Sequence, residues 1–245
     1  MIVTNVETGW ELVFQRSHGL LAGQIAEEFK NEHKPELWVE TLEAILSHDD
    51  YKEPFDGRNY VTELGAPMDF SLVDLDAEQR VKETKRRIRE SKRKHRWIGL
   101  LVSRHAEELY GKEEEVSDEM RQLLEDHKSW RRSTLRQVKR RKADLEHAYQ
   151  LLRWCDRCSL ILVRGLIPAM QRKLEITHGL EGTRYDLWQR DDDTIGIEPW
   201  PFAKKAFQVG VEVHLATQLA FQDDHDLIEH IEQSEIAYRT WDFQQ

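Results

Sequence analysis

The sequence is poor in cysteine and has no long hydrophobic run, and each shortage excludes a class of protein. Its 245 residues include two cysteines, which cannot form the disulfide framework of a small secreted domain and fit a reducing compartment. No apolar run approaches the roughly 18 residues that span a bilayer, and the N-terminus lacks the basic-then-apolar layout of a signal peptide. We therefore expect a soluble, cytoplasmic protein that does not act at a membrane.

Charge and tryptophan are what the sequence does have. A hydrophobic fraction of 39% and eight tryptophans indicate a folded protein, although 33% of the residues are charged. The net charge of -10 conceals two basic blocks, residues 80–96 and 131–142, which hold 17 of the 36 basic residues and only two acids. Such blocks could attract phosphate groups. Acidic segments flank both and no aromatic residues interleave them, so we interpret them as solvated helix faces rather than a nucleic-acid-binding surface.

The order of hydrophobic patterns predicts an α+β fold that is mainly helical. Residues 2–6 and 10–14 read as a β-hairpin around Gly9, and helical periodicity then runs from a predicted N-cap at Ser17 to about residue 166. Short strand patterns return near residues 185–189, 194–197, 209–215 and 238–243, with a short helix between the last two. We expect a helical bundle at 17–166, with residues 1–16 and 183–245 forming a small antiparallel sheet packed on it.

The stretch Ser47-His48-Asp49-Asp50 places three potential metal ligands together at the end of a predicted helix that Pro35 opens. His48 continues the helical face of Thr41 and Ile45, so its imidazole should point toward the core. A buried imidazole needs a partner, and carboxylates beside it would be costly to bury without a counter-charge. A divalent cation would relieve that cost.

Three further helices carry polar residues at core-facing positions. His18 lies in line with Ala22 and Ile25, His105 shares an apolar stripe with other core residues, and Asp156 falls on the inner face of the last long helix. Facing helices that each contribute nitrogen or oxygen ligands are a common way to build a metal site. A mixed set of imidazoles and carboxylates favours Mn, Fe, Co, Ni or Zn over Mg.

The order His, His-Asp and a late Asp resembles the HD-domain superfamily of metal-dependent phosphohydrolases. The resemblance implies that His18, His48, Asp49 and Asp156 bind a divalent ion inside a helical bundle, with His105 in the place of the extra histidines that some members use. The chain is also similar to an uncharacterised, HD-like bacterial family of unknown function, through the residues Met1-Ile2-Val3, His48-Asp49-Asp50, Met68-Asp69-Phe70 and Trp154 to Leu160.

The resemblance implies hydrolysis of a nucleotide or another small phosphorylated molecule by a metal-activated water. Asp50 would orient or deprotonate that water, and His105 would contact the phosphate or protonate the leaving group. Lys52, Arg16 and Arg104 are adjacent to these positions and are candidate phosphate-binding residues. The irregular segment 51–74 is long enough to shape a substrate site.

Other functions remain open or are disfavoured. A non-catalytic HD-like domain that binds a ligand or partner through its basic helices is the alternative. Trp154-Cys155-Asp156-Arg157-Cys158 imitates a redox motif, but that chemistry requires the first cysteine at a helix N-terminus, and this pair falls within a predicted helix. Asp191-Asp192-Asp193 begins like a calcium loop, but Ile195 occupies its fifth position, so we expect a hairpin turn there.

Overall fold

The structure is a computed structural model of the whole chain, and it describes residues 1–50, 60–73, 75–112 and 116–245. The longer helices are α1 Gln15–Glu27, α2 Trp38–Leu46, α3 Ala77–Lys94, α4 Arg96–Tyr110, α5 Asp118–Gln137, α6 Lys142–Val163 and α7 Asp224–Gln233. The strands are β1 Ile2–Val6, β2 Gly9–Val13, β3 Leu174–His178, β4 Arg184–Gln189, β5 Ile195–Glu198, β6 Ala206–Ala216 and β7 Glu235–Gln244.

The described strands form one seven-stranded sheet in the order β1-β2-β6-β7-β5-β4-β3. Neighbouring strands are antiparallel except β5 and β7, which are parallel, so the sheet is mixed. In β6, Val209, Val211 and Val213 are buried while Gln208 and Glu212 are exposed. This alternation is what a strand with one face on the core requires.

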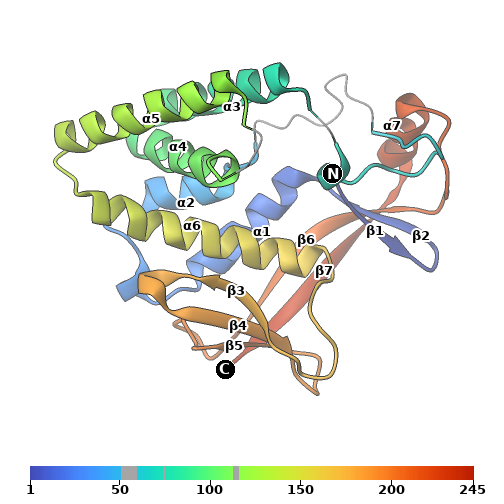
Figure 1. Cartoon of the computed structure of the whole chain (residues 1–245). Coiled ribbons are helices and arrows are strands. Elements are labelled where there is room, and N and C mark those ends of the chain that lie inside the picture. Colours follow the sequence, from blue (N-terminus) through green and yellow to red (C-terminus); the bar gives the residue numbers. More distant parts are fainter. Residues whose placement is uncertain (51–59, 74, 113–115) are drawn as a thin grey trace.

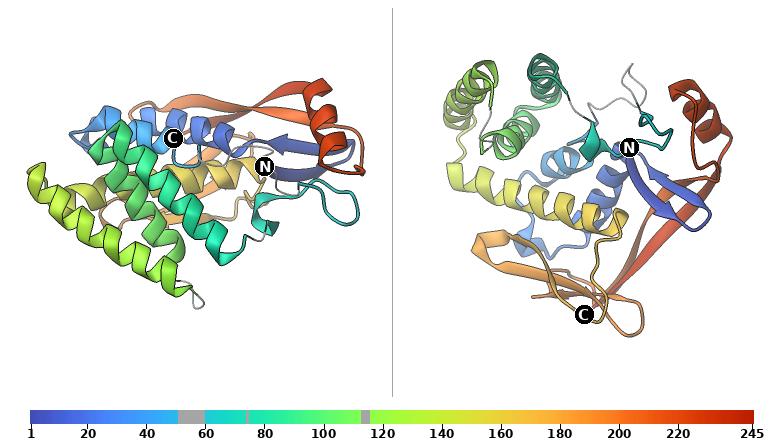
Figure 2. Two further views of the ribbon diagram at one scale, coloured as in Figure 1. Left: turned by 90° about the horizontal axis from the view of Figure 1, so that it is seen from above. Right: turned by 45° about the vertical axis from the view of Figure 1, so that its right-hand side comes forward.

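Helices α1 to α6 cover one side of this curled sheet in two layers, whereas α7 packs against β6 in a separate hydrophobic cluster with Met1 and Leu12. Helix α6 lies between β3 and the outer helices, and it packs against α1, which in turn contacts β6 (Figure 1). Helices α3, α4 and α5 form the outer layer, and the views of Figure 2 show them on the side of α6 opposite β3 to β5. Helices α1 and α6, which lie between the sheet and the outer helices, bury apolar residues on more than one face, as expected for buried helices.

The main hydrophobic core joins helices to sheet around Trp154, whose side chain is fully buried in α6. Its ring meets those of Phe29, Phe202 and Tyr185 edge-on, with centroid distances of 5.0, 5.8 and 5.8 Å. Edge-to-face aromatic contacts of this kind add to the stabilisation from burial. Because these rings come from a helix, a loop and a strand, the helical layer and the sheet are stabilised together.

The expected helical bundle with a small antiparallel sheet is wrong. The sheet has seven strands and is mixed, because β6 and β7 are long, β3 adds a strand the sequence patterns did not reveal, and β5 pairs with β7 in parallel. Helices α1 and α6 bury their apolar faces partly against this sheet and not only against other helices. The architecture is α+β, with helices layered on a large sheet.

Two of the long helices begin at a capping side chain, and the N-cap predicted at Ser17 is wrong. Asp76 caps α3 by accepting from Gln79 N at 2.7 Å, and Ser117 caps α5 by accepting from Met120 N at 3.2 Å. Ser17 is not an N-cap, because α1 begins two residues earlier, after the extended residue Phe14. The hairpin predicted around residues 190–193 is present as β4 and β5.

Candidate metal centre

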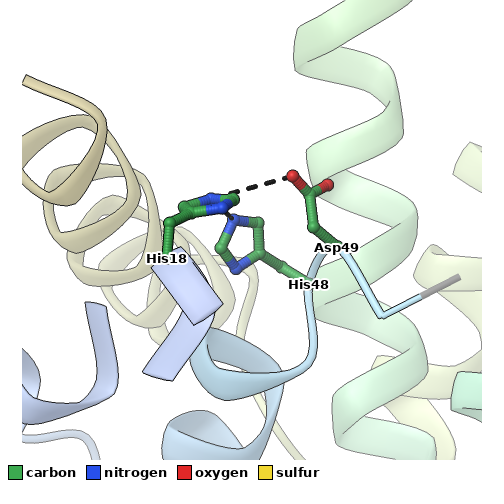
Figure 3. Close-up of side chains that lie close together, drawn as sticks. All are labelled: His18, His48 and Asp49. Atoms are coloured by element: carbon green, nitrogen blue, oxygen red, sulfur yellow. Dashed lines mark hydrogen bonds and ion pairs between the residues drawn. The ribbon is translucent and has the colours of Figure 1, made fainter. Parts of the chain in front are cut away.

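Four predicted ligands from three separate regions of the chain meet at one point. His18 projects from α1, His48 and Asp49 lie in the turn after α2, and Asp156 projects from α6. His18 Nε2 lies 3.2 Å from His48 Nε2 and 3.7 Å from Asp49 Oδ2 (Figure 3). Asp156 Oδ1 lies 3.1 Å from His48 Nε2 and 3.5 Å from His18 Nε2. The four side chains that the sequence predicted to share a site therefore lie together.

A glycine allows α1 and α2 to approach closely enough to bring these side chains together. A Cβ atom on Gly19 would stand 2.4 Å from the carbonyl oxygen of Leu46, the last residue of α2. The end of α2 therefore lies directly against the α1 turn that carries His18. The chain then turns, with Asp50 N donating to Ser47 O, and this turn directs His48 inward.

The hydrogen bonding of His48 prepares its outer nitrogen for a ligand role. His48 Nδ1 lies 2.7 Å from the carbonyl oxygen of Ile45, and only the protonated nitrogen can donate there. Metal-binding histidines usually make such a bond with one ring nitrogen, which fixes the tautomer and leaves the other free to coordinate. His18 Nδ1 is buried and has no hydrogen-bond partner within the described ranges.

Burial and charge act against each other in this cluster. The side chains of His18 and His48 are 0% and 1% exposed, and those of Asp49 and Asp156 are 11% and 16% exposed. Burial alone would lower the pKa of His48, but the Asp156 carboxylate outweighs it and raises that pKa to about 9. Burial would raise the pKa of Asp156, but the imidazoles of His48 and His18 hold it well below its usual range.

The donor set fits a single divalent cation. Donor atoms that bind one ion at about 2.1 Å lie roughly 3.0–3.4 Å apart in octahedral or tetrahedral geometry. The nearest donor atoms of His18, His48 and Asp156 are separated by 3.1 to 3.5 Å. Ligand atoms of His18, His48 and Asp49 also lie within 4.8 Å of one another. Two imidazoles and two carboxylates would thus surround an ion with little movement.

His105 lies beside this cluster and not within it. Its ring centroid is 5.7 Å from that of His48, and its Nδ1 is 3.5 Å from the Tyr149 hydroxyl. Burial, reinforced by the positive charges of Arg87 and His48, lowers the pKa of His105 to about 3. At neutral pH His105 is therefore an uncharged imidazole, which can donate a hydrogen bond but holds no extra proton to give to a leaving group.

The remaining predicted site residues lie in different surroundings. Asp50 is exposed, and burial of its carboxyl on one side raises its pKa. Arg16 donates to the Asp50 carbonyl oxygen at 2.8 Å. Arg104 donates to Glu146 Oε1 at 3.2 Å and stacks 4.4 Å from the Tyr149 ring centroid, so its charge serves a contact between α4 and α6. Lys52 lies outside the described residues.

Arg87 is a buried residue of α3 that was not among the predicted site residues. It is 3% exposed on the buried face of α3 that also carries Val81, Thr84 and Ile88. The spacing of these positions, three and four residues apart, predicts that Arg87 faces inward with them. The many basic residues around Arg87 made this pattern hard to recognise. Arg87 lines a cavity that Asp50 also lines.

Comparison with known proteins places the chain in a family. A family model described as a protein of unknown function, DUF3891, matches residues 1–218. The chain belongs to the DUF3891 family. No curated protein and no solved structure shows significant similarity to it. None of the helices in the described part of this DUF3891 protein is long and apolar enough to cross a membrane.

The basic blocks of this DUF3891 protein are not simply solvated faces. Arg140 donates to Glu36 Oε1 at 2.8 Å, which ties the start of α6 to the segment before α2. Arg131 is 5% exposed and donates to Ser103 Oγ at 2.8 Å, and Arg87 is equally buried. The interpretation of both blocks as solvated is therefore wrong for Arg87 and Arg131, because helix packing buries these two arginines.

Proposed function

We propose that this protein is a metal-dependent phosphohydrolase that acts on a nucleotide or another small phosphorylated molecule. The observation that carries the proposal is the meeting of His18, His48, Asp49 and Asp156, which are up to 138 positions apart in the sequence. His18 Nε2 lies 3.2 to 3.7 Å from a donor atom of each of the other three, and His48 Nε2 lies 3.1 Å from Asp156 Oδ1. Four buried or nearly buried polar side chains without a structural reason to converge are a recognised mark of a functional site.

The proposed ion is Mn, Fe, Co, Ni or Zn rather than Mg, because two of the four donors are imidazole nitrogens. When bound, such an ion lowers the pKa of water and polarises a phosphoryl oxygen. His48 is held for this role by the hydrogen bond from its Nδ1 to Ile45 O. Asp49 and Asp156 supply negative charge that offsets the charge of the cation.

The hydrolytic step assigns roles to two residues outside the ligand set. The oxygen of a water attacks phosphorus, the ester P–O bond breaks, and the water proton passes to the Asp50 carboxylate, whose raised pKa suits a proton acceptor. Neutral His105 donates a hydrogen bond to a phosphoryl oxygen. The leaving group takes its proton from solvent in this scheme, because His105 carries none to give.

The order of the ligands in the sequence also supports the proposal. Histidine on a first helix, His-Asp after a second and aspartate on a late core helix follow the pattern of the HD-domain superfamily. The sheet described here is larger than that resemblance implied, so the proposal depends on the donor geometry rather than on the fold.

Metal content and activity measured together test the proposal. Wild-type protein purified with Mn, Fe, Co, Ni and Zn supplied should contain about one ion per chain, and His48→Ala should lose it. His225→Ala, which removes an exposed histidine, is the matched control and should keep the ion. Hydrolysis of p-nitrophenyl phosphate and of nucleoside monophosphates should follow metal content across the three proteins. Full activity in metal-free His48→Ala would refute the proposal, and metal-replete wild-type protein without ion would favour a non-catalytic binding domain.

A further inference from the structure

A groove of about 840 Å³ lies between α4, α5 and the first turns of α6. Helix α4 contacts both α5 and α6, which diverge from their short connection (Figure 1). The buried side chains of Leu135 and Leu145 form part of its lining, and none of the proposed metal ligands does. Its volume falls within the range of about 300–1,000 Å³ that is usual for small-molecule sites. The groove is therefore large enough for a small-molecule ligand and separate from the candidate metal centre.

The lining of this groove is strongly basic. The described residues that line it include eight arginines or lysines and three glutamates. The chain as a whole has a net charge of -10. Clustered charges of one sign in a concave surface produce a local potential that draws in ligands of the opposite sign. The groove therefore attracts anions, whereas the chain as a whole repels them.

The three glutamates of the groove are already paired, each with a different basic residue of the lining. Glu107 accepts a hydrogen bond from Arg131, Glu146 from Arg104 at 3.2 Å and Glu108 from Lys112 at 2.8 Å. Two more basic residues of the lining pair with glutamates outside it, Lys128 with Glu125 and Arg140 with Glu36. These five cations are compensated within the protein.

The other three basic residues of the groove are Arg132, Arg136 and Lys142. Their side chains are exposed, and they make no hydrogen bond or ion pair with any residue that the structure describes. Arg132 and Arg136 lie on one face of α5 with their Cβ atoms about 5–6 Å apart, and like charges at this spacing destabilise a helix. Lys142 is the first residue of α6, so it reaches the groove from a second helix. A bound anion would relieve the repulsion among these side chains.

The spacing of these three side chains suits a ligand with several negative groups. An arginine binds phosphate oxygens in pairs, and a lysine binds phosphate as a point charge. A chain of linked phosphates carries negative charge on every phosphate group, so it can contact all three residues at once. The described lining includes no aromatic side chain on which a nucleobase would stack. Recognition should therefore depend on the phosphate chain itself.

We propose that this groove binds a chain of linked phosphates, with Arg132, Arg136 and Lys142 as its donors. Inorganic oligophosphates and the triphosphate of a nucleotide share this chemistry. The described lining offers a nucleobase no aromatic partner, which favours the inorganic chain. The site does not depend on the proposed phosphohydrolase function, because no proposed metal ligand takes part in it.

Calorimetric titration of inorganic tripolyphosphate into full-length protein freed of metal ions tests the inference. The double variant Arg132→Gln/Arg136→Gln should weaken binding at least about tenfold, and Lys142→Gln about threefold, because charged hydrogen bonds are lost. Arg89→Gln removes an exposed arginine of α3 outside the groove and should change affinity less than about twofold. Glutamine is close to arginine in helix propensity, so these variants should fold. His48→Ala should bind tripolyphosphate as wild type does.

The comparison of ligands completes the test. Tripolyphosphate binding that is absent from wild type, or equal in wild type and the double variant, overturns the site whatever the metal content. Orthophosphate that binds as tightly as tripolyphosphate overturns the requirement for a chain. Tighter binding of a hexaglutamate peptide overturns the proposal in favour of an acidic protein partner. ATP that binds no more tightly than tripolyphosphate upholds the inorganic chain, and ATP that binds more tightly upholds the site with a nucleotide as the source of the phosphates.

Discussion

His18 Nε2 and His48 Nε2 face each other at 3.2 Å, with their ring planes 83° apart. Both side chains are almost completely removed from solvent. Two imidazoles at this distance cannot both carry a proton on the facing nitrogens, so one must act as acceptor. In the ion-free protein, a proton on His48 Nε2 that is shared with Asp156 prevents repulsion between the two facing nitrogens. A cation bound between the rings would have the same effect. Proton and metal should therefore compete for the same place.

Replacement of Asp156 by asparagine should weaken both interactions. Asp156→Asn keeps the size of the side chain but removes the charge that raises the pKa of His48, so that pKa should fall from about 9. Affinity for the ion should fall at least about tenfold, because a direct ligand is lost. Histidine NMR titrations and metal dialysis measure the two effects. Asp118→Asn, at a 92% exposed side chain on α5, should change neither. An unaltered His48 titration in Asp156→Asn would contradict the assignment.

The metal-free protein should lose stability as the pH rises from about 6.5 to 9. His48 has a raised pKa in the folded state, so its stabilising contribution is complete below the unfolded pKa of 6.5 and disappears as the pH passes 9. A shift of this size corresponds to about 3 kcal/mol in the free energy of unfolding. Urea titrations at the two pH values measure it.

The matched variant for this pH series is His48→Gln, which should lack most of the slope. The comparison removes the contribution of other groups that titrate in the same range. Equal pH dependence in wild type and His48→Gln would show that the proton is not held at this imidazole.

Substitution of Gly19 by alanine should damage the centre without touching a ligand. The new Cβ would meet the Leu46 carbonyl at 2.4 Å, and because this atom is backbone, the end of α2 must move. We expect a loss of about 1–3 kcal/mol in stability and a fall of about tenfold in metal affinity. Gly23→Ala is the control, since its Cβ meets side-chain atoms of Leu46 and Leu42 and no backbone atom of α2, and the Leu46 side chain can rotate. Equal metal affinity in both variants would show that the approach of α1 to α2 does not position His48.

The two cysteines should be inert in the folded protein. Cys155 and Cys158 are fully buried and unpaired in α6, and burial raises the pKa of both thiols. A thiol reagent should therefore label neither residue in native protein and both in concentrated guanidinium chloride. Rapid labelling of native protein, or a disulfide between the pair, would restore the redox interpretation of the motif.

Much of the local structure was predictable because it depends on neighbouring residues. Asp76 and Ser117 each cap a helix by accepting a hydrogen bond from the backbone N–H three residues later. Such a bond depends only on a short side chain and its near neighbours in the sequence. The sheet was not predictable in the same way. The parallel pairing of β5 with β7 joins Ile195 to Phe243, and nothing near either residue specifies a partner 48 positions away.

For the candidate centre too, the features that depend on neighbouring residues were predictable and those that depend on packing were not. Periodicity alone indicated that His18 and Asp156 face inward, since a helix repeats its faces every three to four residues. His48 was expected on a helical face, but α2 ends at Leu46 and the turn that follows directs the ring inward. Arg87 was hidden by the charges around it, because a sequence does not show which arginine of a basic helix is covered by another helix.

The sequence by itself determined which helix faces are apolar and that His18 and Asp156 lie on such faces, because each depends on residues within about one or two helical turns. Tertiary structure alone decided that these two side chains meet His48 and Asp49, that the sheet is large and mixed, and that Arg87 is buried. Those outcomes depend on how closely separate elements can pack. At the candidate centre, the contact of Gly19 with Leu46 sets the distance between α1 and α2.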